Sequence, residues 1–276
     1  MSPLSSQAEP GEGSAFLTQK PRPLSEGETL LFLDSKDRRY LIKLQHGGKF
    51  QTHNGVIAHD DVIGQSDGST LKSNTGSSFS VYRPTMSEFI LKMPRGAQVI
   101  YPKDLGPILM AADIFPGCHV LESGVGSGAL SATLVRAGAS VTGYELREDF
   151  ANRARKNVAN LLGEAALQSY CVEVRDIYEG VSVKTVDRVL LDLPEPWRVV
   201  EQVQDVLVSG GILLAYTPSI LQAAQLNERL VNSGYRMCET VEILQRGWHI
   251  KAQAVRPDHR MVAHTGFLTY GRKTES

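Results

Sequence analysis

Residues 120–130 read Val-Leu-Glu-Ser-Gly-Val-Gly-Ser-Gly-Ala-Leu, an apolar strand that runs into a glycine-rich turn and the start of a helix. Glycine permits a sharp turn and a close approach of the backbone to a ligand, and the start of a helix presents free N–H groups. About twenty residues further on, Glu145 ends the next strand, where a carboxylate can accept hydrogen bonds from two ribose hydroxyls. This stretch therefore predicts an α/β fold that binds a nucleotide-like cofactor.

Outward from this turn, apolar strands alternate with amphipathic helices, which predicts a mainly parallel sheet covered on both faces. A helix is predicted over 149–162, with Gly163 as its stop. Segments 235–244 and 266–270 have no clear helix between them, and we expect them to pair antiparallel at the edge of the sheet. The predicted parallel strands are 119–122, 140–145, 168–175, 187–193 and 211–217.

The part of the chain before this α/β region has a different character. Residues 1–20 are polar and have no apolar core segment, so they predict a disordered tail and not a signal peptide. Residues 21–84 contain short β-like runs broken by turn residues, including an expected hairpin between 30–33 and 40–44. We therefore predict a small β-rich N-terminal domain over 21–84 and a catalytic domain over 85–276.

The composition and the cysteine and histidine spacing limit the classes of protein to which this chain can belong. Lys plus Arg number 29 against 30 Asp plus Glu, which counts mildly against a nucleic-acid partner unless several subunits assemble a basic cleft. The chain is 42% apolar, typical of a soluble protein, and no apolar run approaches the ~20 residues that a bilayer requires. The three cysteines are widely spaced and the seven histidines lack ligand spacing. We expect a cytoplasmic protein with no metal and no membrane contact.

The glycine turn alone leaves two cofactors open. Gly124, Gly126 and Ala129 also satisfy the dinucleotide pattern, so NAD is the alternative to S-adenosyl-L-methionine. Asp176 lies just past the third strand, where a carboxylate can accept from the amino group of the cofactor's adenine. Glu122 opens the turn with an acidic residue, as is frequent in methyltransferases. These two residues favour the methyl donor without excluding NAD.

The sequence at the end of the fourth strand distinguishes between the two candidate cofactors. Residues 189–197 read Val-Leu-Leu-Asp-Leu-Pro-Glu-Pro-Trp. Two prolines remove backbone donors and impose a rigid extended loop, which leaves the Asp192 carboxylate free to face a ligand. Methyltransferases that act on amino nitrogens of bases often carry a shorter Asp/Asn-Pro-Pro-aromatic sequence at this place. A dehydrogenase has no need for such a loop, so the methyl donor is the favoured cofactor.

Taken together, these motifs resemble the tRNA (adenine-58-N1)-methyltransferase family in its bacterial and archaeal single-gene form. The resemblance extends over roughly residues 30–270. Its most specific pieces are Arg-Gly-Ala-Gln-Val-Ile-Tyr-Pro-Lys-Asp at 95–104, the turn at 122–130, Tyr-Glu-Leu-Arg at 144–147, Asp-Leu-Pro-Glu-Pro-Trp at 192–197, Leu-Gln-Arg-Gly-Trp at 244–248, Ala-Val-Arg-Pro at 254–257 and His-Thr-Gly-Phe-Leu at 264–268.

The resemblance implies a Rossmann-like class I methyltransferase sheet, a small N-terminal β-rich domain and a homotetramer. It implies methylation of N1 of adenine 58 in the T-loop of tRNA, with S-adenosyl-L-methionine as the donor. The residues that it places around the cofactor are Ser127, Gly128, Ala129, Leu130, Glu145, Phe150, Asp176 and Asp192, with Gln98 nearby. Two departures from the family are Ser123, usually Ala, and Phe150, often His. Phe150 can still pack against an adenine.

Our hypothesis for the chemistry assigns the catalytic role to Asp192. N1 of neutral adenine has a lone pair, and its methylation puts a positive charge on the ring that a carboxylate stabilises. The base has to be extruded to reach the pocket, and Tyr101 and Trp197 are candidates to stack on it. Trp197 is equally well explained as a core anchor. Arg246 is a candidate for RNA contact.

Two other functions remain open at this level. A methyltransferase for a protein or a small molecule would share the cofactor site, and only the family-specific motifs argue against it. A non-catalytic tRNA-binding subunit, as in two-subunit relatives, would lose the glycine turn and the acidic residues. The residues that argue against this second alternative are Gly124, Gly126, Gly128, Glu145, Asp176 and Asp192, all of which are present.

Overall fold

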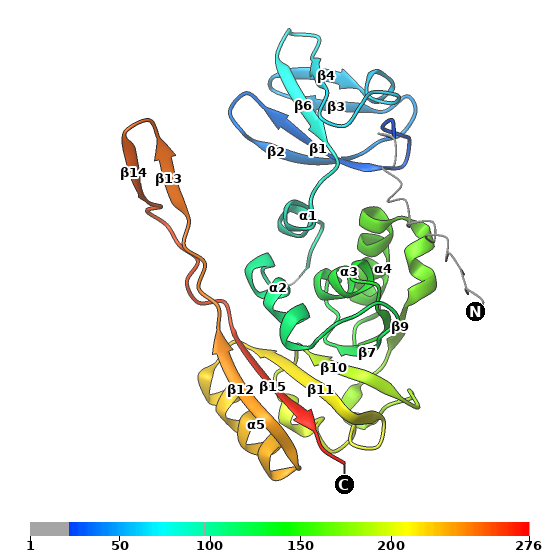
Figure 1. Ribbon diagram of the computed structural model, residues 1–276. Helices are drawn as coiled ribbons and strands as arrows, with labels where there is room; N and C mark the ends of the chain where they lie inside the picture. The colour runs from blue at the N-terminus through cyan, green and yellow to red at the C-terminus, as the bar shows by residue number, and fades with distance from the viewer. Residues whose placement is uncertain (1–21, 97, 276) are drawn as a thin grey trace, which may run out of the picture.

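The computed structural model describes residues 22–96 and 98–275, so the tail predicted at 1–20 lies outside the described residues. Figure 1 shows three parts of the described chain: a β-rich module at the N-terminal end, an α/β unit, and a two-stranded arm that projects from this unit. The helix α1 (Met86–Lys92) lies in the connection between the module and the α/β unit.

The N-terminal module is built from short antiparallel strands around a cluster of aromatic rings. Phe50 lies between Phe32 and Phe79, with ring centroids 4.8 and 5.5 Å apart. The predicted hairpin is confirmed, with Leu31 opposite Leu41 in the antiparallel pair. The strands are β1 (Thr29–Asp34), β2 (Arg39–Lys43), β5 (Thr70–Lys72) and β6 (Ser78–Tyr82) in the order β2-β1-β6-β5, and the pair β3 (Lys49–Thr52) and β4 (Gly55–Ala58).

The α/β unit contains a seven-stranded sheet in the order β12-β15-β11-β10-β7-β8-β9. The five predicted parallel strands are all present, and β11 begins at Leu207 instead of residue 211. The expected antiparallel pair is also present, with β12 at the edge and β15 between β12 and β11. The strands are β7 (His119–Ser123), β8 (Ser140–Glu145), β9 (Tyr170–Val174), β10 (Val186–Leu191), β11 (Leu207–Thr217), β12 (Tyr235–Glu242) and β15 (Phe267–Lys273).

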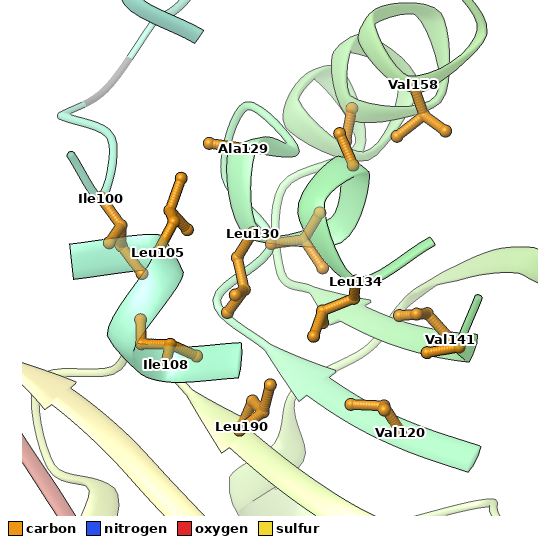
Figure 2. Packing of buried hydrophobic residues seen from close by; sticks show 14 of the residues in the cluster. Ile100, Leu105, Ile108, Val120, Ala129, Leu130, Leu134, Val141, Val158 and Leu190 are labelled. Atoms are coloured by element: carbon orange, nitrogen blue, oxygen red, sulfur yellow. The ribbon is translucent and has the colours of Figure 1, made fainter. Parts of the chain in front are cut away.

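Helices cover both faces of this sheet because successive residues of its central strands point to opposite faces. Val120 belongs to one buried apolar cluster and the next residue, Leu121, belongs to the other. Figure 2 shows the first cluster, where Leu130 and Leu134 lie above Val120 and Leu190 of the sheet. The helices of the unit are α2 (Pro102–Ala111), α3 (Ala129–Arg136), α4 (Glu148–Leu162) and α5 (Ile220–Asn232).

The structure confirms the predicted end of the helix that follows β8. The helix predicted over 149–162 is α4, and Gly163 is its C-cap as predicted, with φ of 89°. Within 22–96 and 98–275, no helix combines the length and the apolar character that crossing a membrane requires.

The segment between β12 and β15 contains a hairpin that the sequence reasoning did not predict. Its strands β13 (Trp248–Lys251) and β14 (Ala254–Pro257) pair antiparallel, and every residue of β13 is exposed. We call residues 244–264 the arm; it projects away from the α/β unit in Figure 1. An alternation over four residues is too short to stand out in a sequence, and none of it contributes to the core.

Both ends of the arm are held by the first turn of α2. Asp104 is fully buried, and its Oδ1 lies 2.8 Å from Lys103 Nζ. Lys103 Nζ also donates to the carbonyl oxygen of Ile243 at 2.6 Å, just before the arm. Thr265 Oγ1, just after the arm, donates to Asp104 Oδ2 at 2.7 Å. The buried Lys103–Asp104 pair therefore fixes where the arm leaves the α/β unit.

Substitution of Asp104 by Ala is expected to destabilise the fold, because it leaves the buried Lys103 ammonium without its counter-charge. Breaking one partner of a buried ion pair typically costs about 3–5 kcal/mol of unfolding free energy. Urea denaturation measures the difference. The exposed ion pair between Glu201 and Arg229 supplies the control: Glu201→Gln should change the unfolding free energy by less than about 1 kcal/mol. Equal effects of the two substitutions would contradict the structural role of the Lys103–Asp104 pair.

Candidate functional site

The glycine turn between β7 and α3 lies against the loop that follows β10. Gly124 has φ of +83°, and a Cβ built there would lie 2.0 Å from the carbonyl oxygen of Asp192. No residue with a side chain fits at that position without displacing the loop. At Gly126 the situation differs, since the nearest atom to a built Cβ, the carbonyl oxygen of Gly124, is 3.9 Å away. The backbone at Gly126 therefore borders open space, where a ligand can approach it.

The carboxyl ends of three adjacent strands, β10, β7 and β8, meet at this turn. The N–H of Asp192, the residue after β10, donates to Ser123 O at 2.9 Å, and the N–H of Gly124 donates to Tyr144 O at 3.1 Å. Ligands of open α/β sheets bind outside these carboxyl ends, and here β7 lies between β10 and β8. The sheet thus brings together residues that are far apart in the sequence.

A recess at this place collects most of the predicted cofactor residues. Val99, Ile100 and Val125 also line it and were not predicted, although the first two lie inside the quoted motif at 95–104. Val125 likewise lies inside the turn at 120–130, so the signal that would have found all three is an apolar side chain within a motif that carries predicted cofactor residues. The complete lining is Gln98, Val99, Ile100, Gly124, Val125, Gly126, Ser127, Ala129, Leu130 and Asp192.

Glu145 is positioned at the edge of the turn by two backbone donors. Its Oε2 accepts from the N–H of Gly126 at 2.8 Å, and its Oε1 accepts from the N–H of Arg147 at 3.0 Å. A carboxylate has about four acceptor positions, so each oxygen keeps one for a further donor. This geometry suits a pair of neighbouring hydroxyls, as in a ribose.

Phe150 and Asp176 lie on the α4 and β9 side of the sheet and not in the recess lining. The Phe150 ring is buried, with the guanidinium carbons of Arg147 and Arg153 4.1 and 5.1 Å from its centroid. Asp176 caps a short 3-10 turn, and its Oδ1 accepts from the N–H of Tyr178 at 2.9 Å. Their predicted contacts with the cofactor's adenine stay predictions.

Glu122 points into the protein interior beneath the turn. It is 1% exposed, and its Oε2 accepts from Ser131 Oγ at 2.7 Å, which in turn accepts from Tyr170 OH at 3.0 Å. Burial raises the pKa of Glu122 to about 8. Glu122 is not among the residues that line the recess. Its Oε1 and the hydroxyl of Ser127 are buried polar atoms without a partner in the described part of the chain.

Asp192 carries the other perturbed carboxyl group. Its side chain is half-buried and lines the recess, where protein atoms surround most of the carboxyl group. This desolvation, with the nearby charge of Glu145 as a second cause, raises the pKa of Asp192 to about 7. A carboxyl group that titrates near neutrality is a feature of functional sites.

The three predicted substrate residues separate into two groups. Tyr101 precedes α2 as its N-cap and follows Ile100 of the recess lining. Arg246 lines a shallow groove with Pro102 and Lys103, on the same side of the unit. Trp197 instead packs against the apolar cluster on the other face and lines a separate groove with residues of α5. The structure does not bring Trp197 to the recess, which favours its interpretation as a core anchor.

No group of three His, Cys, Asp or Glu side chains is placed to hold a metal ion in the part of the chain that the structure describes. The arrangement around the recess offers backbone N–H groups, carboxylates and an apolar wall. It is suited to binding and orienting an organic ligand.

Two family descriptions match this chain. "tRNA methyltransferase complex GCD14 subunit" matches residues 79–258, and "TrmI-like N-terminal" matches residues 23–71. The chain is 34% identical to the tRNA (adenine(57)-N(1)/adenine(58)-N(1))-methyltransferase TrmI of Methanocaldococcus jannaschii, over 88% of this chain and 94% of that protein. It is 32% identical to the tRNA (adenine(58)-N(1))-methyltransferase TrmI of Thermus thermophilus, over 88% and 96%.

Two solved structures are also similar over most of their length. A SAM-dependent O-methyltransferase from Thermotoga maritima aligns with a TM-score of 0.85 at 31% identity, covering 92% of this chain and 95% of that one. The tRNA (m1A58) methyltransferase TrmI from Aquifex aeolicus aligns with a TM-score of 0.77 at 31% identity, covering 92% and 100%.

The raised pKa of Asp192 predicts a pH-dependent cost to folding. The folded state holds the proton up to about pH 7 and the unfolded state only to about 3.8, so ionisation destabilises the folded protein as pH rises between these values. Asp192→Asn should remove this cost and raise the unfolding free energy at pH 8 by roughly 1–4 kcal/mol.

Urea denaturation at pH 5 and pH 8 measures this effect. The gain from Asp192→Asn should shrink by about half or more at pH 5, since the wild-type carboxyl group is then largely protonated in the folded state. The exposed Asp205→Asn serves as the matched control and should alter stability equally at both pH values. A gain from Asp192→Asn that is the same at both pH values would contradict the burial argument.

Proposed function

The chain belongs to the TrmI family of tRNA (adenine(58)-N(1))-methyltransferases, and on this premise we propose that it methylates N1 of adenine 58 in the T-loop of tRNA. S-adenosyl-L-methionine is the methyl donor and 1-methyladenosine is the product. The observation that carries the proposal is a recess that contains the open backbone of Gly126 and the Asp192 carboxyl group, with the Glu145 carboxylate bonded to the N–H of Gly126.

The residues around the recess fit S-adenosyl-L-methionine, which supplies an electrophilic methyl group on a positively charged sulfonium. Glu145 keeps acceptor positions for the ribose hydroxyls. The unpartnered Ser127 hydroxyl is available to a polar group of the ligand. Charge also discriminates between cofactors: a sulfonium is attracted by Glu145 and Asp192, whereas the pyrophosphate of NAD would add negative charge beside them.

We assign roles to the remaining predicted cofactor residues from their positions around the recess. Gly128 caps the start of α3, so the N–H groups of the first helical turn face the ligand. Phe150 and Asp176 are assigned to the adenine end, on the far side of Glu145 from Asp192. Glu122 is assigned a supporting role beneath the turn, because its carboxyl group bonds to Ser131. The wall of the pocket is formed by Gln98, Ser127, Ala129 and Leu130.

Asp192 is the proposed catalytic residue. Bound S-adenosyl-L-methionine would supply the methyl group through cleavage of its S–CH3 bond and would leave as S-adenosyl-L-homocysteine. Adenine N1 has its own lone pair to accept the methyl group, so no residue of the chain has to remove a proton first. The Asp192 carboxylate accepts a hydrogen bond from the N6 amino group, which orients the ring and stabilises the positive charge that develops on it. That charge favours the ionised form of a carboxyl group whose pKa in the free protein is about 7. Tyr101 is assigned to stack on the extruded base.

One observation favours a second candidate substrate class. The similar protein from Thermotoga maritima, whose structure aligns with a TM-score of 0.85, is described as an O-methyltransferase, an enzyme that acts on an oxygen of its acceptor. The cofactor half of the recess would serve either substrate. Identification of the methylated atom therefore decides between them.

Methyl transfer to an unmodified tRNA transcript tests the proposed function. With labelled S-adenosyl-L-methionine, the wild-type chain should produce 1-methyladenosine at position 58. Asp192→Ala should lower kcat by about 10²–10³-fold, the loss typical of removing one group that stabilises transition-state charge. The exposed Asp205→Ala is the matched control and should retain wild-type activity.

Nucleoside analysis and mapping of positions 57 and 58 identify the product. Labelled tRNA without 1-methyladenosine would contradict the assigned acceptor atom, and full activity of Asp192→Ala would contradict its catalytic role. Label at position 57 as well would extend to this chain what the name of the Methanocaldococcus jannaschii relative states for that protein.

A homotetramer is part of the proposal, and the arm supports it. Trp248, Ile250 and Val255 are 57, 73 and 58% exposed, and strand alternation places them on one face of the hairpin, with Ile250 opposite Val255. An apolar patch of this kind on a projecting element marks a protein interface. A cytoplasmic location is likewise proposed; the three cysteines, all free thiols, are compatible with it.

The assembly is tested by light scattering coupled to size exclusion. The wild-type chain should elute as four copies of the 30.2 kDa chain. Ile250→Ser combined with Val255→Ser should shift the mass to a smaller species, because it removes the apolar face of the arm. The control Leu221→Ser changes an equally exposed residue on α5 and should leave the mass unaltered. An unchanged mass for the double variant would exclude the arm from the interface.

A further inference from the structure

The arm has a second face, opposite to its apolar one, and this face is basic. In the β13–β14 pair, His249 lies opposite Arg256 and Lys251 lies opposite Ala254. Directly opposed residues of an antiparallel pair share a face, and neighbours along a strand point to opposite faces. His249, Lys251 and Arg256 therefore project together from the side that Ile250 does not occupy. All of them are exposed.

The arm differs in charge from the rest of the chain. Residues 244–264 carry four Lys or Arg side chains against one carboxylate, Asp258, whereas the whole chain has 29 against 30. Some exposed cations elsewhere have a carboxylate beside them: Arg147, Arg175 and Arg198 lie 3.1, 3.0 and 2.8 Å from carboxylate oxygens. The cationic side chains of the arm, Arg246, Lys251, Arg256 and Arg260, form no ion pair within 22–96 and 98–275.

The arm begins beside the mouth of the recess. Its two ends are fixed by the Lys103–Asp104 pair in the first turn of α2. Tyr101 lies directly before that helix, and Ile100 before it lines the recess. Arg246, at the root of the arm, shares a groove with Lys103. Exposed cationic side chains thus extend from Arg246, at the root of the arm, outward along the hairpin.

We propose that the face of the arm formed by His249, Lys251 and Arg256, together with Arg246 at its root, binds the sugar-phosphate backbone of the tRNA substrate. Side chains two positions apart on a strand are separated by about 7 Å, so Lys251 and His249 can each meet a separate phosphate. Contacts of this kind position a nucleic acid without reading its sequence. The inference rests on the proposed function, because tRNA is the polyanion that the reaction requires.

The energetics of the reaction explain why such a surface is needed. Extruding a base from its stack costs a few kcal/mol, and binding energy from distant parts of the substrate can offset that cost. The near-neutral total charge gives the chain no general attraction for RNA. An arm with an apolar face against another copy and a basic face toward solvent concentrates positive charge where the substrate lies.

The salt dependence of tRNA binding tests the assignment. We compare the wild-type chain with Lys251→Gln/Arg256→Gln, using fluorescence anisotropy of labelled, unmodified tRNA over a range of KCl concentrations. Each lost phosphate contact lowers the slope of log affinity against log salt by about 1, so the double variant should be shallower by about 2. KM for tRNA should rise, while kcat should stay at the wild-type value because neither residue touches the reacting atoms.

A matched variant and two integrity checks accompany this comparison. Lys184→Gln/Arg236→Gln removes the same charge from exposed residues away from the arm and should keep the wild-type slope. Binding of S-adenosyl-L-homocysteine and the mass of the assembly should be unaltered in both double variants. These checks separate a local loss of phosphate contacts from unfolding or from a change of total charge.

The outcomes distinguish this inference from the proposed function. A double variant in the arm that keeps the wild-type slope and KM, in a wild-type background that makes 1-methyladenosine, overturns the arm assignment alone. A changed mass with an unchanged slope also overturns it and assigns these cations to contacts between copies. A shallower slope in a chain that methylates no adenine supports the arm as an RNA-binding surface and removes the proposed function.

Discussion

The contact between Gly124 and the carbonyl of Asp192 is the constraint on which the site depends. A Cβ at position 124 would lie 2.0 Å from that carbonyl oxygen, so the strand ends of β7 and β10 can meet only if this residue is glycine. The hydrogen bond from Asp192 N to Ser123 O closes the same junction. Because the two strands meet here, the backbone that borders the cofactor space and the proposed catalytic carboxyl group share one recess. The apolar cluster in Figure 2, with Leu130 above Leu190, holds the helix that follows the turn.

The electrostatics of the three carboxyl groups around the glycine turn follow from this packing. Glu122, Glu145 and Asp192 come from three adjacent strands, and only Glu145 receives two backbone N–H donors. The other two carboxyl groups are desolvated, which raises the pKa of Glu122 to about 8 and that of Asp192 to about 7. The Glu145 carboxylate beside the recess, and Asp192 within it when ionised, favour a ligand with positive charge and disfavour one with phosphates. The proposed cofactor and the proposed cationic product both match that preference.

Most of the α/β unit was predictable because its signals are local or periodic. The turn at 120–130, the helix ending at Gly163 and the buried strands each depend on residues that are close in sequence. The antiparallel pair of β12 and β15 was expected for the same reason. The direction of Glu122 was not predictable, since it depends on Ser131 and Tyr170, which arrive from other elements. The placement of Trp197 depends in the same way on α5. The arm was not predictable because its strands are exposed and show no hydrophobic pattern of a buried strand. Its anchor was not predictable either, because the buried Lys103–Asp104 pair joins segments more than a hundred residues apart in sequence.

The most direct measurement of the central claim is a crystal structure of the chain with S-adenosyl-L-homocysteine. We expect the ribose hydroxyls to donate to Glu145, the backbone at Gly126 to contact the ligand, and the sulfur to face the Asp192 side of the recess. Asp192 should then border the space left for the acceptor base. A ligand bound elsewhere, or one whose sulfur lies on the far side of the glycine turn from Asp192, would contradict the account.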